Sequence, residues 1–162
     1  MKITSYNAPS ENQTGVTGTW DLTKISSLTG VSSDGKSVLS NDVVVPATTD
    51  GGAVLTLLAN KSSKPKFNKG LQMNTGSKAF EVATVKGAAG KKLTVVCENA
   101  SSNAKSSSGT VNAIEISFGN QSFKWTDGST VTNSTQTLTY TLENESVTIS
   151  GSGVKIKKVT VE

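Results

Sequence analysis

The chain has 162 residues, enough to bury one hydrophobic core unaided, and its single cysteine excludes a disulfide within one chain. Its formal charge of +4 comes from lysine alone, because the 16 basic residues include no arginine, and histidine is absent as well. Arginine reads guanine edges and binds phosphate through two parallel hydrogen bonds, so its absence argues against a nucleic-acid partner. The absence of histidine excludes Ser-His and Cys-His nucleophile pairs.

Composition favours a β-protein. Serine and threonine make up more than a quarter of the residues, and with 15 glycines and 3 prolines they favour short strands joined by polar turns. No stretch approaches the roughly 20 apolar residues needed to cross a bilayer, so we expect no membrane partner. We expect residues 1–15 to form a flexible lead-in and residues 16–162 to form a single domain.

The first half of the chain predicts a strand, a helical turn and a lysine-rich loop. Trp20 begins the first clear strand, where a large ring is typical of a core position. Residues 24–31 predict one helical turn, the only helical signal in the chain. Residues 61–70, KSSKPKFNKG, predict a surface loop that Pro65 stiffens before the next strand. This loop contains Lys61, Lys64, Lys66 and Lys69.

Apolar residues alternate with polar residues wherever hydrophobicity rises later in the chain, which is typical of half-buried strands. The phase slips by one residue at Lys157 and Lys158, which predicts a bulge. Residues 98–110 predict a polar hairpin loop or a flexible insertion. The alternation, with glycine turns between the runs, predicts an antiparallel β-sandwich. The predicted inward-facing residues are Leu93, Val95, Cys97, Ile114, Ile116, Phe118, Leu138, Tyr140, Leu142, Val147, Ile149, Val154, Ile156, Val159 and Val161.

Few residues suggest catalytic or metal chemistry. Cys97 reads as a small apolar side chain on a strand rather than as a reactive thiol. The acidic residues are scattered singly and read as solvated carboxylates, although two carboxylates or a lysine base leave an enzyme as an alternative. Asp34, Asp50 and Asp127 each precede a glycine in a turn. We expect no cofactor; a structural calcium ion stays open, without defined ligands.

Two residues near a later turn are candidates for ligand binding. Lys124 and Trp125 lie on a strand that runs into the turn at Asp127. Strand alternation places Trp125 on the same side as Phe123, so its ring can serve either the core or an exposed surface.

Four segments resemble a known family. They are GTWDLTK at 18–24, KGLQMNTGSKAFEV at 69–82, GKKLTVVCENASS at 90–102 and the terminal GVKIKKVTVE. In this order they resemble the jelly-roll modules appended to bacterial pectate lyases and related secreted polysaccharide-degrading enzymes. The chain departs from the family pattern where Leu22, Met73 and the pair Lys157-Lys158 replace aromatic residues.

The resemblance implies a jelly-roll β-sandwich that acts as a non-catalytic carbohydrate-binding module on plant cell-wall polysaccharide. It also implies an extracellular or cell-surface bacterial protein, a monomer tethered to a catalytic domain or a larger surface protein. With only eight aromatic residues, several of them needed in the core, the chain suits an acidic glycan such as pectin held through lysine. The predicted ligand-binding residues are Lys61, Lys64, Lys66, Lys69, Lys124 and Trp125.

Two alternatives stay open. The lysines can serve only to keep the protein soluble and to protect sheet edges from pairing. The domain can also be a structural or adhesive β-sandwich module of a bacterial cell-surface protein, in which a Lys-Asn crosslink would take the place of disulfides.

Overall fold

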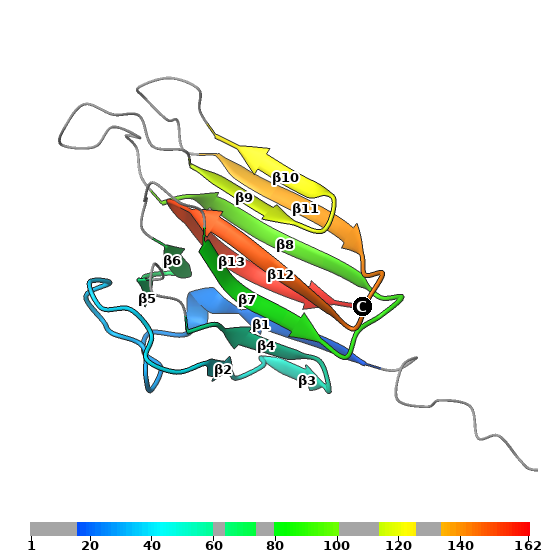
Figure 1. Ribbon diagram of the computed structural model, residues 1–162, viewed down its shortest axis with the longest axis horizontal. Helices are drawn as coiled ribbons and strands as arrows, with labels where there is room; N and C mark the ends of the chain where they lie inside the picture. Colours follow the sequence, from blue (N-terminus) through cyan, green and yellow to red (C-terminus); the bar gives the residue numbers. More distant parts are fainter. Residues whose placement is uncertain (1–15, 60–63, 74–79, 101–113, 126–133) are drawn as a thin grey trace, which may run out of the picture.

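A computed structural model of the chain describes residues 16–59, 64–73, 80–100, 114–125 and 134–162. Two antiparallel β-sheets pack face to face around one hydrophobic core, so the predicted all-β sandwich is confirmed (Figure 1). No helix in the described ranges is long and apolar enough to span a membrane.

The first sheet contains seven strands in the described part of the chain. Its main order is β11-β8-β13-β1-β3, and β6 and then β5 extend it beside β13. The strands are β1 (Thr17–Asp21), β3 (Thr49–Gly51), β5 (Pro65–Phe67), β6 (Leu71–Met73), β8 (Lys92–Asn99), β11 (Thr135–Thr141) and β13 (Val154–Val161).

The second sheet has six described strands in the order β10-β9-β12-β7-β4-β2. The chain changes sheets between β7 and β8, between β8 and β9, and twice more between β11 and β13. The two sheets are therefore built up together along the chain, and not one after the other. The strands are β2 (Val43–Val45), β4 (Val54–Leu57), β7 (Phe80–Lys86), β9 (Glu115–Phe118), β10 (Gln121–Lys124) and β12 (Ser146–Ser152).

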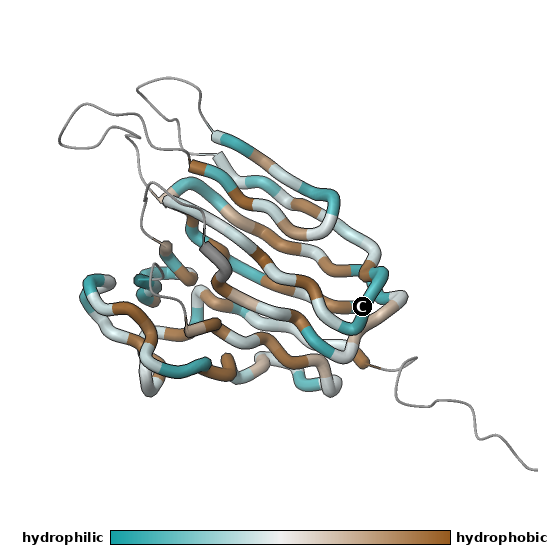
Figure 2. The backbone as a smooth tube through the Cα atoms, in the orientation of Figure 1, coloured by the Kyte–Doolittle hydropathy of each residue, from teal (hydrophilic) through white to brown (hydrophobic). Residues whose placement is uncertain are grey.

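Alternation along the strands builds the core. In β8, Leu93, Val95 and Cys97 are buried while the residues between them reach the outer face, and Figure 2 shows the same exchange of apolar and polar residues along the neighbouring strands. Of the predicted inward set, Leu138, Tyr140 and Val147 are half-buried and pack against the core, and the rest are buried.

Trp20 joins the two sheets, so its predicted core position is confirmed. Its side chain is 1% exposed, and its indole Nε1 donates a hydrogen bond to the carbonyl oxygen of Val45 at 3.2 Å. Since Trp20 belongs to β1 and Val45 to β2, this bond connects the first sheet to the edge of the second.

The predicted bulge in β13 is also confirmed. The register with β8 shifts between Ile156 and Lys158, which leaves Lys157 as the extra residue. The shift keeps Val154 and Ile156 on the core side before it and Val159 and Val161 on the core side after it. Without the extra residue, one of these pairs would face solvent.

The helical turn lies earlier than predicted. A short 3₁₀ turn (η1) spans Leu22–Lys24, and the Asp21 side chain accepts a hydrogen bond from the Thr23 backbone N–H at its start. Within 24–31 the chain instead makes a reverse turn in which the Val31 N–H donates to the Leu28 carbonyl. Gly30 in this turn has φ +87°, outside the range of a right-handed helix.

Some predictions concern residues that the structure does not describe. They are the lead-in at 1–15, Lys61, Asp127, and the predicted polar loop beyond Ala100. Residues 98 and 99 of that predicted loop belong to the end of β8.

Gly119, in the turn between β9 and β10, supports a sharp stability test. A Cβ atom there would lie 2.4 Å from Cζ of Tyr140, and Gly119 has φ +55°. We expect Gly119→Ala to lower the free energy of unfolding by roughly 1–3 kcal/mol more than Gly90→Ala, measured by urea unfolding. Gly90 is the matched control because it has φ +78° but no atom within 4 Å of such a Cβ. Equal losses would show that the Tyr140 ring moves aside freely.

Candidate functional site

The β5–β6 hairpin presents most of the predicted lysines. Pro65, Leu71 and Met73 are buried and hold the hairpin against the core, while Lys64 and Lys69 are exposed. Lys69 sits at the tip of the turn with φ +52°, and the Asn68 N–H donates to the Gly70 carbonyl across that turn at 2.9 Å. The apolar residues thus fix the hairpin in place, and its lysines point away from the core.

Lys66 begins a cross-strand row on the outer face of the first sheet. It lies opposite Gln72 of β6, and Gln72 lies opposite Lys155 of β13. The adjacent residues Leu71 and Ile156 are buried, so alternation turns this row outward. Two strand spacings separate Lys66 from Lys155, which places their Cα atoms about 10 Å apart.

One carboxylate continues the row and meets two ammonium groups. Glu98 of β8 lies opposite Lys155, whose Nζ is 4.0 Å from Glu98 Oε1. Lys157 Nζ lies 3.3 Å from the same oxygen. Because a single negative charge faces two positive charges, this group keeps a net positive charge. We define the basic surface as Lys64, Lys66, Lys69, Lys155 and Lys157.

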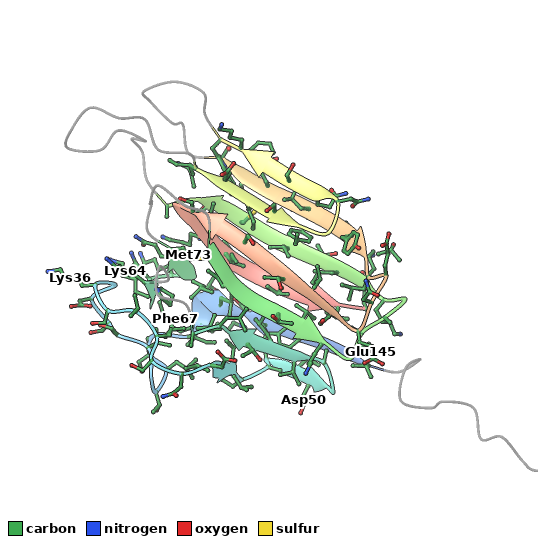
Figure 3. The ribbon with its side chains drawn as sticks, viewed as in Figure 1. Lys36, Asp50, Lys64, Phe67, Met73 and Glu145 are labelled. Atoms are coloured by element: carbon green, nitrogen blue, oxygen red, sulfur yellow. The ribbon has the colours of Figure 1, made fainter. Side chains whose placement is uncertain are left out.

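The loop before β2 lies against the basic surface. A Cβ atom on Gly35 would lie 3.0 Å from Cδ of Lys66, so this loop packs directly on the Lys66 stem. Figure 3 shows Lys36 and Lys64 on this side of the molecule. Asp34 is the nearby carboxylate; its pKa is lowered by the hydrogen bond from the Ser32 hydroxyl and then by the Lys36 backbone N–H. Lys36 therefore adds a further cation beside the surface.

The hairpin lysines have no acidic partner in the described ranges. Ion pairs there join Lys24 to Asp21, Lys92 to Glu162, and Glu98 to its two lysines, and none includes Lys64, Lys66 or Lys69. The positive charge of these side chains is left for solvent or for a ligand.

Threonine hydroxyls flank the basic surface on the same sheet face. The strand registers bring one threonine from each of five neighbouring strands into a single row. Side chains directly opposite one another in such a row lie about 5 Å apart, which gives a regular line of hydrogen-bonding groups. The row consists of Thr139, Thr94, Thr160, Thr19 and Thr49.

Lys124 and Trp125 lie apart from the basic surface, at the edge of the second sheet. Lys124 is exposed at the end of β10. The Trp125 ring is half-buried, packs edge-on against Phe123 with centroids 4.9 Å apart, and donates from Nε1 to the Ser134 carbonyl at 2.9 Å. Its ring therefore packs against the core.

The structure thus gathers three of the six predicted binding residues, namely Lys64, Lys66 and Lys69. It adds Lys155 and Lys157, which the sequence analysis did not choose. Alternation in GVKIKKVTVE already turned Lys155 outward, but its position beside the hairpin depends on the pairing of β6 with β13. That pairing joins residues more than 80 positions apart and leaves no local pattern in the sequence.

Cys97 is a core residue, as predicted. It is fully buried, and its Sγ lies 3.8 Å from the Gln136 carbonyl oxygen. Burial, with a smaller effect from the Glu98 charge, raises the pKa of the Cys97 thiol to about 12. The thiol is therefore protonated and inert at neutral pH.

Metal chemistry finds no support in the described residues. They contain no group of three or more acidic, histidine or cysteine side chains that could hold an ion. Asp34 and Asp50 instead accept backbone N–H bonds within their own turns, from Lys36 at 2.9 Å and from Gly52 at 3.0 Å.

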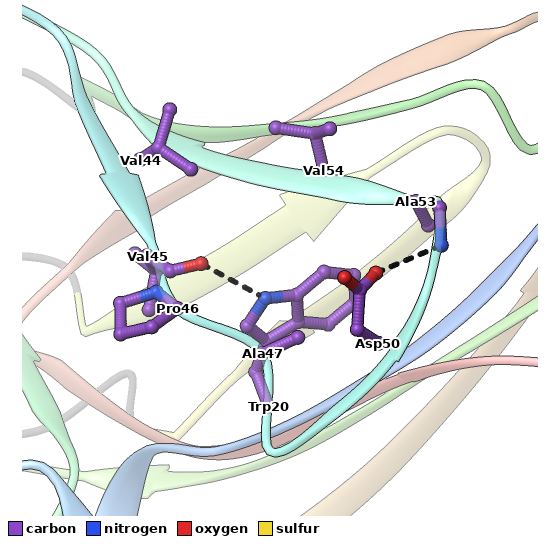
Figure 4. A pocket seen from close by; sticks show the side chains of 9 residues that line it. Trp20, Val44, Val45, Pro46, Ala47, Asp50, Ala53 and Val54 are labelled. Atoms are coloured by element: carbon purple, nitrogen blue, oxygen red, sulfur yellow. Dashed lines mark hydrogen bonds between the residues drawn. The ribbon is translucent and has the colours of Figure 1, made fainter.

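A pocket of about 380 Å³ opens between β2, β3 and β4 (Figure 4). Its only charged residue is Asp50, whose carboxylate accepts the Gly52 N–H. An apolar pocket with one carboxylate does not suit an acidic ligand. The pocket is lined by Trp20, Val44, Val45, Pro46, Ala47, Asp50, Gly52, Ala53 and Val54.

Comparisons of the chain with protein-family models, with curated proteins and with solved structures found no match.

The burial of Cys97 predicts a silent thiol. In the folded protein at about pH 8, we expect almost no reaction with a disulfide reagent such as DTNB, because reaction needs an accessible thiolate. Full reaction should follow denaturation. Thr49→Cys, which places a thiol at an exposed position, should react at once and serves as the control. Rapid reaction of the unmodified protein would contradict the burial of Cys97.

Proposed function

We propose that this chain is a non-catalytic carbohydrate-binding module that binds acidic plant cell-wall polysaccharide, such as the galacturonic acid backbone of pectin. The supporting observation is the basic surface: its hairpin lysines have no acidic partner among the described residues, and it continues to Lys155 and Lys157 across one sheet face. The resemblance to modules of secreted pectin-degrading enzymes supports the same ligand class.

The row from Lys66 to Lys155 suits a polymer with repeated carboxylates. Lysine ammonium groups form charge-assisted hydrogen bonds to carboxylates, and the side chain of Gln72 between them can bond to sugar hydroxyls. Each exposed contact contributes on the order of 1 kcal/mol or less, so binding requires several lysines at once. A polyuronate lying across the strands would meet these lysines in sequence.

The aromatic residues argue against a neutral glycan. Proteins bind neutral glycans by stacking the sugar rings on exposed aromatic side chains, and none of the aromatic side chains whose burial the structure describes is exposed. Trp20 and Phe118 are buried, and Phe67, Phe123, Trp125 and Tyr140 are half-buried and pack against the core. Charge and hydroxyl groups are therefore the recognition chemistry that this face offers.

The carboxylates support the non-catalytic part of the proposal. Glu98 and Glu162 form ion pairs with lysines, and Asp21 and Asp34 cap local turns. These are structural uses, and the pocket between β2, β3 and β4 is lined by a single carboxylate, that of Asp50. By the resemblance, we propose that the module works outside a bacterial cell, tethered to a catalytic domain or a larger surface protein.

The structural or adhesive alternative gains no specific support. The buried polar side chains of the described residues are Asn99 and Ser152, and no described lysine is buried. A Lys-Asn crosslink in the core would need a buried lysine beside the amide.

The proposal predicts the effect of removing two hairpin lysines. We expect Lys64→Ala/Lys66→Ala to bind polygalacturonate roughly tenfold more weakly, because two charge-assisted contacts are lost. Isothermal titration calorimetry or affinity electrophoresis would measure the change, and higher salt should weaken binding of the unmodified protein. The folded state should be retained, since Lys64 is exposed and Lys66 only half-buried.

The matched control is Lys86→Ala/Lys91→Ala, which removes the same charge beside the turn from β7 to β8, at the opposite end of β8 from Glu98; Lys86 is exposed and Lys91 half-buried, as Lys64 and Lys66 are. It should bind like the unmodified protein. Equal weakening by both variants would show that binding depends on the net charge of the protein and not on the position of the lysines. If the hairpin variant binds as well as the unmodified protein, its lysines serve solubility and not binding. If the unmodified protein binds no acidic wall polysaccharide, the proposed function is refuted.

A further inference from the structure

Among the residues that the structure describes, one sheet edge lacks the usual protection against pairing. Natural sheets protect free edges with short strands, charges, proline or bulges. Among the described edge strands, β2 and β3 have three residues each, β5 begins with Pro65 and includes Lys66, and β10 has four residues and ends in Lys124. By contrast, β11 has seven residues, TQTLTYT, without charge, proline or glycine, and pairs with β8 at all seven without a register shift.

The backbone groups on the free side of β11 can be assigned. At the end of the strand, the Leu142 N–H donates to the Lys91 carbonyl at 2.8 Å, so even-numbered residues of this segment direct their backbone groups toward β8. Alternation directs those of the odd-numbered residues outward. In the described part of the chain, no hydrogen bond reaches them. The outward groups belong to Thr135, Thr137, Thr139 and Thr141.

We propose that β11 pairs antiparallel with β11 of a second copy of this chain, about a two-fold axis at Leu138. The sequence TQTLTYT reads nearly the same in both directions about this residue. The register then places Thr135 opposite Thr141 and Thr137 opposite Thr139. Every hydrogen-bonded pair consists of two threonines, and the Leu138 residues of the two copies face each other at the centre.

The physical chemistry of this pairing is favourable. Each outward threonine exchanges two backbone hydrogen bonds with its partner, and directly opposed threonines are a stabilising cross-strand pair. An isologous contact closes on itself, so it yields a dimer rather than a filament. The chains each have a charge of +4, so their repulsion keeps the association weak at low salt and salt strengthens it. The dimer differs from the monomer expected from the sequence, and it does not depend on the glycan proposal.

Sedimentation or light scattering from micromolar to millimolar protein tests the dimer. The unmodified chain should shift from monomer to dimer mass, at lower concentration when salt is added. Thr139→Pro should stay monomeric, because proline removes one outward N–H while the bonds to β8 remain. Thr139→Val retains that N–H and should still form dimers. A monomer at all concentrations, a dimer with the proline variant, or growth into larger aggregates would each overturn the proposal.

A charge variant tests the same interface even if the proline variant fails to fold. Thr137→Lys/Thr139→Lys would place four like charges across the two-fold axis and should abolish the dimer. Val44→Lys/Thr49→Lys adds the same charge at exposed positions on other edges and should leave the dimer intact, apart from a small general repulsion. Equal effects of the two variants would exclude β11 as the interface.

Disulfide formation tests the register. In the proposed pairing the two Leu138 Cα atoms lie about 4.5 Å apart, within the range that a disulfide spans. Leu138→Cys should therefore give a covalent dimer on mild oxidation. Thr135→Cys alone should not, since its two copies would lie roughly 20 Å apart. The native Cys97 is buried and takes no part. Cross-linking of both variants, or of Thr135→Cys only, would refute the two-fold axis at Leu138.

Discussion

The extra residue at Lys157 is the constraint on which the rest of this sandwich depends. Strand β13 lies between β8 and β1 and also pairs with β6, so an error in its register would displace its partners on both sides. The bulge keeps apolar residues facing the core along the whole strand, although their sequence spacing changes midway. A strand without it would turn half of its apolar residues to solvent.

The same bulge determines the chemistry of the outer face. On one side of it β13 pairs with β1, and on the other side with β6 of the lysine hairpin. Lys155 and Lys157 therefore reach the single carboxylate of Glu98 from two directions, and neither is far from Lys66. A core requirement thus fixes where positive charge collects. This explains how a sheet built for stability acquires a surface suited to an acidic polymer.

Local sequence patterns predicted much of the fold and less of the site. Alternation identified the buried faces of β8, β9 and β13, and its change of phase located the bulge, because both depend only on neighbouring residues. Long-range features were not predictable in this way. The pairing of β6 with β13 and the bond from Trp125 to Ser134 depend on how distant segments pack. Sequence alone therefore chose the hairpin lysines but not Lys155, and left Trp125 undecided.

The proposed dimer and the proposed glycan surface share one face of the first sheet. A two-fold axis at the β11 edge, perpendicular to the sheet, would place both basic surfaces on the same side of the joined sheet. The path from β5 through β6, β13 and β8 to β11 and then across the axis spans nine strand spacings, roughly 40 Å. A long polyuronate can bridge that distance and a short oligosaccharide cannot. Because each lysine contact is weak, binding two linked surfaces at once raises the effective affinity far more than an additional contact on one surface. The absence of strong single contacts on this face is therefore compatible with firm attachment to a polymer, provided that the ligand is long and the edge of β11 is paired.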